Sequence, residues 1–208
     1  MDAGLAAVLG ATVGALGTAA TGATAALLSR STARHQARSE TLRVLRESRR
    51  AAYTSFAEMS GRYKDMLATT LIPLGRVDRF PEQREEWIED AHKRWKKALR
   101  FRQMEFDRQR ILLHLDATRP VADAATELRK RFVLLSRATC RAIEAHKGED
   151  LDTGPLTAPS PGYAELLANE GLDPERPDLD LLLSRADDAY NAFLDVAAVD
   201  LGEDGLLA

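Results

Sequence analysis

An uncharged stretch of 27 residues constrains the folding of this chain more than any other feature of its sequence. Residues 3–29 contain no Asp, Glu, Lys or Arg, and seven arginines follow by residue 50. As a helix this stretch would be about 40 Å long, and the hydrocarbon core of a bilayer is about 30 Å thick. Its five Leu and two Val favour insertion, whereas its Ala, Gly and Thr residues add little or oppose it. We therefore predict a transmembrane anchor over residues 1–29.

Two other interpretations of this stretch compete with the anchor. A secretory signal peptide begins with a basic segment, but only Met1 and Asp2 precede the uncharged run. The run is also longer than the apolar core of such a peptide. The second alternative, an Ala/Gly-rich helix of a soluble protein, stays open at this point.

The arginines after the uncharged stretch predict the orientation of the anchor. Lys and Arg near the end of a span favour the cytoplasmic side, and none precedes this one. The expected location is the cell membrane, as a single-pass protein with its N-terminus outside and residues 30–208 in the cytoplasm. The same basic flank is expected to contact anionic lipid, through Arg30, Arg34, Arg38, Arg43 and Arg46.

Small residues recur at every fourth position of the predicted anchor. Such a ridge lets two helix backbones approach closely in lipid, and Gly10 and Gly14 form a GxxxG motif. It predicts a homo-oligomer or pairing with another membrane helix, although a segment rich in Ala, Gly and Thr produces this pattern by composition alone. The ridge consists of Ala6, Gly10, Gly14, Thr18, Gly22 and Ala26.

With 208 residues, the chain is long enough for one domain after the predicted anchor, and its cysteine content fits a reducing compartment. The only cysteine, Cys140, excludes an intrachain disulfide, and its helical context favours a small inert thiol. Arginine outnumbers lysine 23 to 6, a bias that favours a bacterial source with a GC-rich genome. The order of an Ala/Gly-rich span and an arginine-rich helical domain is similar to that of single-pass proteins of such bacteria. This similarity implies location only.

Charge is distributed unevenly along the chain. Residues 1–147 carry 27 basic and 17 acidic groups, net +10, whereas residues 148–208 carry 2 and 15, net −13. The acidic end could be a solvating or partner-binding segment. It is also amphipathic, which favours a helix that packs on the basic helices and offsets their charge.

Periodic apolar residues predict about four amphipathic helices after the anchor. The first covers residues 31–72 and ends at Pro73. It can be continuous with the span, because only Ser29, Ser31 and Thr32 suggest a break. Its apolar residues recur every three or four positions, which is typical of coiled-coil packing. They are Leu42, Leu45, Ala52, Phe56, Met59, Tyr63 and Met66.

The second predicted helix begins at Pro81, and its apolar face is Trp87, Ile88, Ala91, Trp95, Leu99, Ile111 and Leu115. A third helix extends from near Pro120 to Gly148.

Residues 149–176 form a Pro/Gly-rich connection with one short helix, capped by Ser160 and ended by Gly171. A final helix starts at Pro177. No segment has the alternation of a strand. The expected fold is all-α: a transmembrane helix (residues 1–29) and an antiparallel helical bundle (residues 30–208).

Two patterns in the sequence could carry chemistry. Glu89 and His92 match one half of a Glu-x-x-His di-metal signature, but no other histidine has a Glu three residues before it. Residues 93–110 combine Lys and Arg with Trp95, Phe101 and Phe106, a pattern that can bind nucleic acid through phosphate contacts and base stacking. The alternative is a bundle helix whose aromatic residues face inward.

The sequence therefore favours a membrane-anchored helical interaction or scaffold protein, without a cofactor and without catalytic activity of its own. A nucleic-acid-binding protein that uses residues 93–110 is the first alternative. A metal-dependent helical-bundle enzyme is the second.

Overall fold

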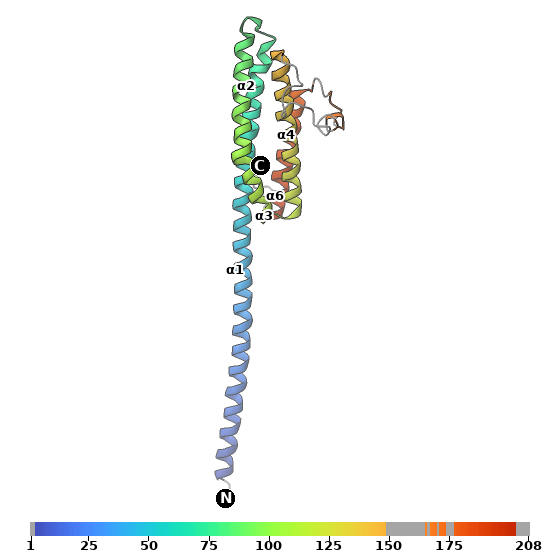
Figure 1. The fold of residues 1–208 in the computed structure, drawn as a ribbon. Helices are drawn as coiled ribbons and strands as arrows, with labels where there is room; N and C mark the ends of the chain where they lie inside the picture. Colours follow the sequence, from blue (N-terminus) through green and yellow to red (C-terminus); the bar gives the residue numbers. More distant parts are fainter. Residues whose placement is uncertain (1–2, 149–164, 166, 170, 174–176, 203–208) are drawn as a thin grey trace. The chain divides into compact units, whose positions relative to one another are not determined.

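The structure is a computed structural model that describes residues 3–148, 165, 167–169, 171–173 and 177–202; the side chains of residues 3–35 and 37 lie outside this description. The described residues contain helices and the turns that join them, and no strand (Figure 1). The predicted all-α fold is therefore confirmed. The α-helices are α1 (Ala3–Val77), α2 (Arg84–Phe101), α3 (Asp107–Asp116), α4 (Arg119–Lys147) and α6 (Leu179–Leu201).

The chain divides into two compact units, Met1–Glu47 and Ser48–Ala208. In the second unit the helices follow one another in alternating directions: the last part of α1, then α2 with α3, then α4, then α6 (Figure 1). This unit is the predicted helical bundle.

Aromatic rings fill the centre of the bundle. The ring of Tyr63 lies 5.4 Å from that of Phe106 and 5.3 Å from that of Phe132. The ring of Phe56 contacts Phe193 edge-on at 5.0 Å. These five side chains are fully buried and come from α1, the turn before α3, α4 and α6. Because such pairs add about 1 kcal/mol each to the energy of burial, the cluster ties the four parts of the bundle together.

Helix α1 continues past the proline at which the sequence predicts its end. Pro73 lies inside the helix, which extends to Val77. Proline removes one hydrogen bond from a helix interior. Here the next turn compensates because it buries Leu74 and Val77 against Ile88, Ala91 and Trp95.

The second predicted helix consists of several pieces. A 3-10 turn (Pro81–Gln83) precedes α2, and a π-helical turn (Arg102–Phe106) joins α2 to α3. Ile88, Ala91 and Trp95 are buried as predicted, but Ile111 is 57% exposed and Leu115 is 76% exposed. The prediction is wrong at those two positions because Phe106, the last residue of the π-helical turn, and Leu113 of α3 occupy the inward face there.

Helix α6 begins with a side-chain cap, and both α4 and α6 end at a glycine. Helix α6 begins after Asp178, whose side chain accepts a hydrogen bond of 2.9 Å from the backbone N–H of Leu181. Gly148 and Gly202 end α4 and α6 with φ of 72° and 70°. Gly171 has φ of 69° and follows the helical residues 167–169, where the sequence predicts that a short helix ends. The predicted cap Ser160 lies outside the described residues.

In the first unit, the described backbone is helical from Ala3 onward. Leu42 and Leu45, expected on an inward face, are 58% and 49% exposed because no other described element of this unit covers them. Within the described part of the chain, no helix has both the length and the apolarity that crossing a membrane requires. The side chains of the predicted anchor and of its small-residue ridge lie outside the described residues.

Candidate interaction surface

The arginines of the predicted lipid flank are only partly described. Arg30 and Arg34 belong to the residues whose side chains lie outside the description. Arg38, Arg43 and Arg46 are exposed, and the Nε of Arg43 lies 3.2 Å from the carboxylate of Glu47. This pair is too exposed to contribute much to stability. Contact of the flank with lipid stays a prediction.

The aromatic residues of the basic segment 93–110 face the interior of the bundle. Trp95 is buried, and its Nε1 donates a hydrogen bond of 3.0 Å to the backbone oxygen of Ser136 on α4. Phe106 is fully buried and Phe101 is half-buried. The outer face of this segment therefore offers charge and aliphatic side chains, but not the rings that would stack on bases.

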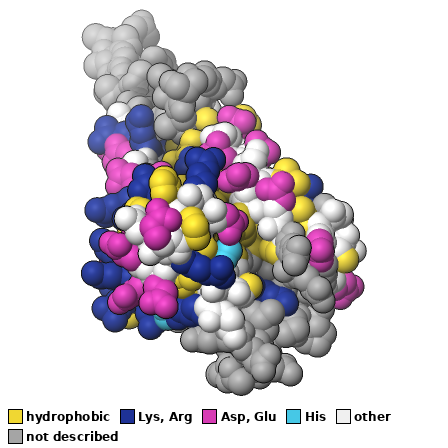
Figure 2. All heavy atoms as spheres, turned by 90° about the horizontal axis from the view of Figure 1, so that it is seen from above, with side chains coloured by type: hydrophobic (Ala, Val, Ile, Leu, Met, Phe, Trp, Pro, Cys, Tyr) yellow, Lys and Arg dark blue, Asp and Glu magenta, His cyan; other side chains and the backbone are white. Residues whose placement is uncertain are grey.

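That outer face is a continuous row of exposed side chains, which we name the basic ridge. Its members follow helical spacing along α2, the π-helical turn and α3, and none of them is acidic, although the adjoining Glu105 is exposed beside Met104. Met104 is 69% exposed, which is unusual for so large an apolar side chain. Viewed from above, many Lys and Arg side chains lie along the left side of the molecule, interspersed with Asp and Glu (Figure 2). The basic ridge consists of Lys93, Lys97, Arg100, Met104, Arg108, Ile111 and Leu115.

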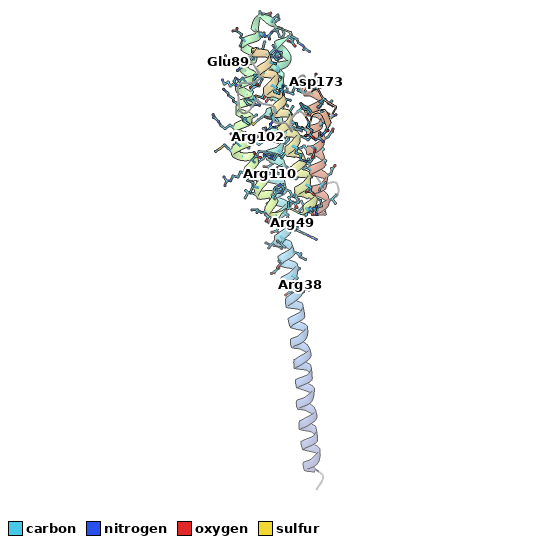
Figure 3. The ribbon with its side chains drawn as sticks, turned by 45° about the vertical axis from the view of Figure 1, so that its right-hand side comes forward. Arg38, Arg49, Glu89, Arg102, Arg110 and Asp173 are labelled. Atoms are coloured by element: carbon cyan, nitrogen blue, oxygen red, sulfur yellow. The ribbon has the colours of Figure 1, made fainter. Side chains whose placement is uncertain are left out.

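A cluster of charges behind the basic ridge holds the π-helical turn in place. Asp107 accepts a hydrogen bond of 2.9 Å from the Nε of Arg129 on α4. Its carboxylate also lies 3.8 Å from the Nε of Arg110 and 4.0 Å from that of Arg102. Arg102 and Arg110 occupy successive levels of the bundle (Figure 3). One partly buried carboxylate thus draws three guanidinium groups toward the junction of α2, α3 and α4.

This cluster adjoins the aromatic core through Tyr63. Burial raises the pKa of the Tyr63 phenol, and the nearby Ser136 hydroxyl and Arg102 guanidinium oppose that shift only in part. The phenol therefore stays neutral at physiological pH. The cluster links the π-helical turn and α3 to α4 beside the aromatic core.

Helix α6 divides its acidic residues between two roles. Asp187 pairs with Lys64 of α1, and Asp200 accepts hydrogen bonds of 2.8 Å from both Tyr53 and Thr118. These contacts agree with the expectation that the acidic C-terminal helix packs on more basic helices.

Two further acidic residues of α6, Asp188 and Asp195, face outward in a row of side chains that we name the acidic ridge. All of its members are exposed, none is basic, and Val199 is 67% exposed. Beside its end lies an open hollow of about 360 Å³ between α4 and α6, lined by Pro120, Val196 and Val199. The acidic ridge consists of Leu181, Ser184, Asp188, Ala192, Asp195 and Val199.

Two further hollows lie between helices of the bundle. One, of about 380 Å³, lies between α1 and α6 over Tyr53 and Phe193. The other, of about 600 Å³, lies between α2 and α4 beside Glu89, His92 and His146.

The second hollow contains both residues of the half di-metal signature. The Nδ1 of His92, however, lies 2.9 Å from the Nζ of Lys147, which competes with a metal for that nitrogen. Among the described residues, no group of three or more His, Cys, Asp or Glu could hold a metal ion.

Cys140 is buried, and its thiol lies 3.4 Å from the carboxylate of Glu144. Burial, together with the negative charge of Glu144, raises the pKa of Cys140 to about 12. A nucleophilic thiol needs the opposite shift, so this thiol is unreactive at neutral pH.

Comparisons with family models, curated proteins and solved structures found no match to this chain.

Sequence reasoning did not identify the two ridges. The spacing of the basic ridge is visible in the sequence, but the helical pattern predicts that its apolar members Ile111 and Leu115 lie in the core. The basic ridge could have been predicted from the sequence, because its basic residues share one helical spacing with Ile111 and Leu115.

Proposed function

We propose that this protein is a membrane-anchored helical interaction protein that acts by binding other molecules. In this proposal residues 1–29 form a single span, the N-terminus is outside the cell, and residues 30–208 form a cytoplasmic domain. The observation that carries the proposal is the uncharged run at residues 3–29 with arginines on one side only.

The bundle supports the binding part of the proposal. It presents one row of basic and apolar side chains and another of acidic and apolar side chains, both held on helices with a packed aromatic core. Exposed apolar side chains in line with charges are typical of surfaces that bind other proteins. In the membrane, the Gly10 and Gly14 ridge would add self-association or a partner helix.

Fractionation tests the proposal. The full-length protein and a version that starts at Ser31 would be expressed in bacteria, and their membranes washed with carbonate and then with detergent. The proposal predicts that only the full-length protein stays in the membrane until detergent is added. If both versions are released without detergent, there is no anchor and the proposal is wrong.

Nucleic-acid binding is a second candidate, which the four cations of the basic ridge favour. Its test is a salt-dependent shift of a short DNA or RNA duplex by the purified protein. Loss of the shift when Lys93 and Lys97 are changed to Glu would support it. Absence of any shift at low salt would exclude it.

A further inference from the structure

Beyond the proposed function, we infer that the basic ridge of one copy of this protein packs against the acidic ridge of a second copy. Both surfaces are rows of exposed side chains on the same bundle, and each lacks the charge that the other carries. The partner that this chemistry fits best is therefore a second copy of this chain. The inference does not require the anchor, because both ridges lie within Ser48–Ala208.

The arginines of the basic ridge and the aspartates of the acidic ridge have no ionic partner in the described part of the bundle. Arg100 and Arg108 are exposed, and among the described residues neither forms an ion pair or a hydrogen bond. The same holds for Asp188 and Asp195, whereas their neighbours Asp187 and Asp200 are occupied by contacts inside the bundle. Two arginines and two aspartates are thus available for contacts with another molecule.

The spacing of these charges matches between the two ridges. Asp188 and Asp195 are seven residues apart, or about two helical turns. Arg100 and Arg108 are eight residues apart, but the π-helical turn Arg102–Phe106 lies between them. Because a π-helical turn takes up one extra residue, eight residues there cover about the distance of seven in an α-helix. Both pairs can therefore form at once.

The apolar ends determine how the two helices align. With Arg100 opposite Asp188 and Arg108 opposite Asp195, Ile111 lies three residues past Arg108 and Val199 four residues past Asp195, so the two fall within one residue of each other. The open hollow beside Val199 is then in reach of Ile111 or Leu115. This alignment makes the two helices parallel and brings the exposed Ile111 of α3 close to the exposed Val199 of α6.

The contact joins two different surfaces, so it is heterologous. Each copy keeps one free ridge after it has bound a neighbour, and assembly continues beyond the dimer unless a ring closes. A single helix-to-helix contact with exposed charges gives weak association. Confinement to a membrane would raise the effective concentration and favour it.

Charge reversal of each ridge tests the inference in full-length protein kept in detergent. One variant carries Arg100→Asp and Arg108→Asp, so that both of its ridges are acidic. The other carries Asp188→Arg and Asp195→Arg, so that both are basic. Each variant is labelled with a donor or an acceptor dye, and association is measured by energy transfer as a function of concentration. Far-UV circular dichroism and the unfolding midpoint verify that each variant is folded.

The inference predicts that each variant alone associates at least about tenfold more weakly than the wild-type protein, because like charges then face each other. A mixture of the two variants regains association, since an acidic ridge again meets a basic one. A control with Arg119→Asp and Lys130→Asp, two exposed cations of α4 outside the ridges, associates like the wild type. A wild-type protein that is monomeric throughout, or a mixture no stronger than either variant alone, overturns the inference.

Association through Gly10 and Gly14 would be the same in the wild type, in both variants and in the mixture, because residues 1–29 are unchanged. Differences among these samples therefore report the contact between the ridges. Failure of the charge test therefore leaves the membrane proposal standing. Failure of the fractionation test likewise leaves the contact between ridges open to measurement.

Discussion

Replacing Asp107 with Asn should destabilise the bundle more than a substitution at an ordinary surface carboxylate. Asp107 is the only acidic partner described for Arg102 and Arg129, and it also faces Arg110. The amide keeps the shape of the carboxylate but removes its charge, which leaves three guanidinium groups close together. The substitution therefore isolates the electrostatic part of the contact.

The magnitude follows from the three distances. A charge-assisted hydrogen bond, such as that from Arg129 at 2.9 Å, contributes about 1.5–3 kcal/mol. The pairs at 3.8 and 4.0 Å contribute about 0.5 kcal/mol each, because water reaches them. The asparagine oxygen recovers part of the first contact. We expect Asp107→Asn to lower the free energy of unfolding by about 2 kcal/mol.

Urea unfolding of the full-length protein in mild detergent, followed by far-UV circular dichroism, measures this change. Asp123→Asn is the matched control, because the pair of Asp123 with Arg119 is 3.8 Å long and its side chains are 75% and 92% exposed. Its expected cost is below about 0.5 kcal/mol. If the two variants unfold at the same urea concentration, the Asp107 cluster does not stabilise the junction and the reasoning is refuted.

Four further predictions follow from other contacts. Trp95→Phe should cost about 1–2 kcal/mol of stability because it removes the buried hydrogen bond to Ser136, and an unchanged unfolding midpoint would contradict this. Asp178→Ala should lower the free energy of unfolding by about 1 kcal/mol, because α6 loses its N-terminal cap. Asp188→Ala, which removes no cap, should leave the free energy of unfolding nearly unchanged in the same measurement. Since the thiol of Cys140 ionises near pH 9.0 when unfolded and near 12 when folded, stability should fall as pH rises between these values. The fall should be shallower in Cys140→Ala, and parallel curves would exclude this origin. Changing Gly10 and Gly14 to Ile should weaken association in a membrane assay, and unchanged association would remove the small-residue ridge from the account.

The sequence was sufficient to predict the helices and much of the core. Phe56, Tyr63, Trp95 and Phe132 lie on apolar stripes of helical period, and all are buried. The pattern works there because each stripe has another helix packed against it.

The same helical spacing gave wrong predictions of burial in two situations. In one, no described helix packs against the apolar stripe; in the other, a π-helical turn rotates the stripe away from the core. Leu42 and Leu45 continue the stripe of Phe56, but no described element of their unit covers them. Ile111 and Leu115 lie after a π-helical turn, and apolarity alone does not tell which face of α3 meets α4. Periodicity identifies candidates for burial, whereas tertiary contacts select among them.

The charge cluster and the ridges were harder to foresee. Asp107 stands among four arginines in the sequence, so its partners depend on how α2, α3 and α4 pack. The acidic character of residues 148–208 was evident, but not its division between inward residues such as Asp187 and outward ones such as Asp188.

Cysteine labelling in intact cells tests the central claim, a single span with the bundle in the cytoplasm, most directly. In a Cys140→Ala background, a new cysteine is placed either at Asp2 or at Gln103, which is exposed on the bundle. A membrane-impermeant maleimide should label Asp2→Cys in intact cells and Gln103→Cys only after the membrane is opened. Labelling of Gln103→Cys in intact cells, or protection of both positions until the membrane is opened, would contradict the account.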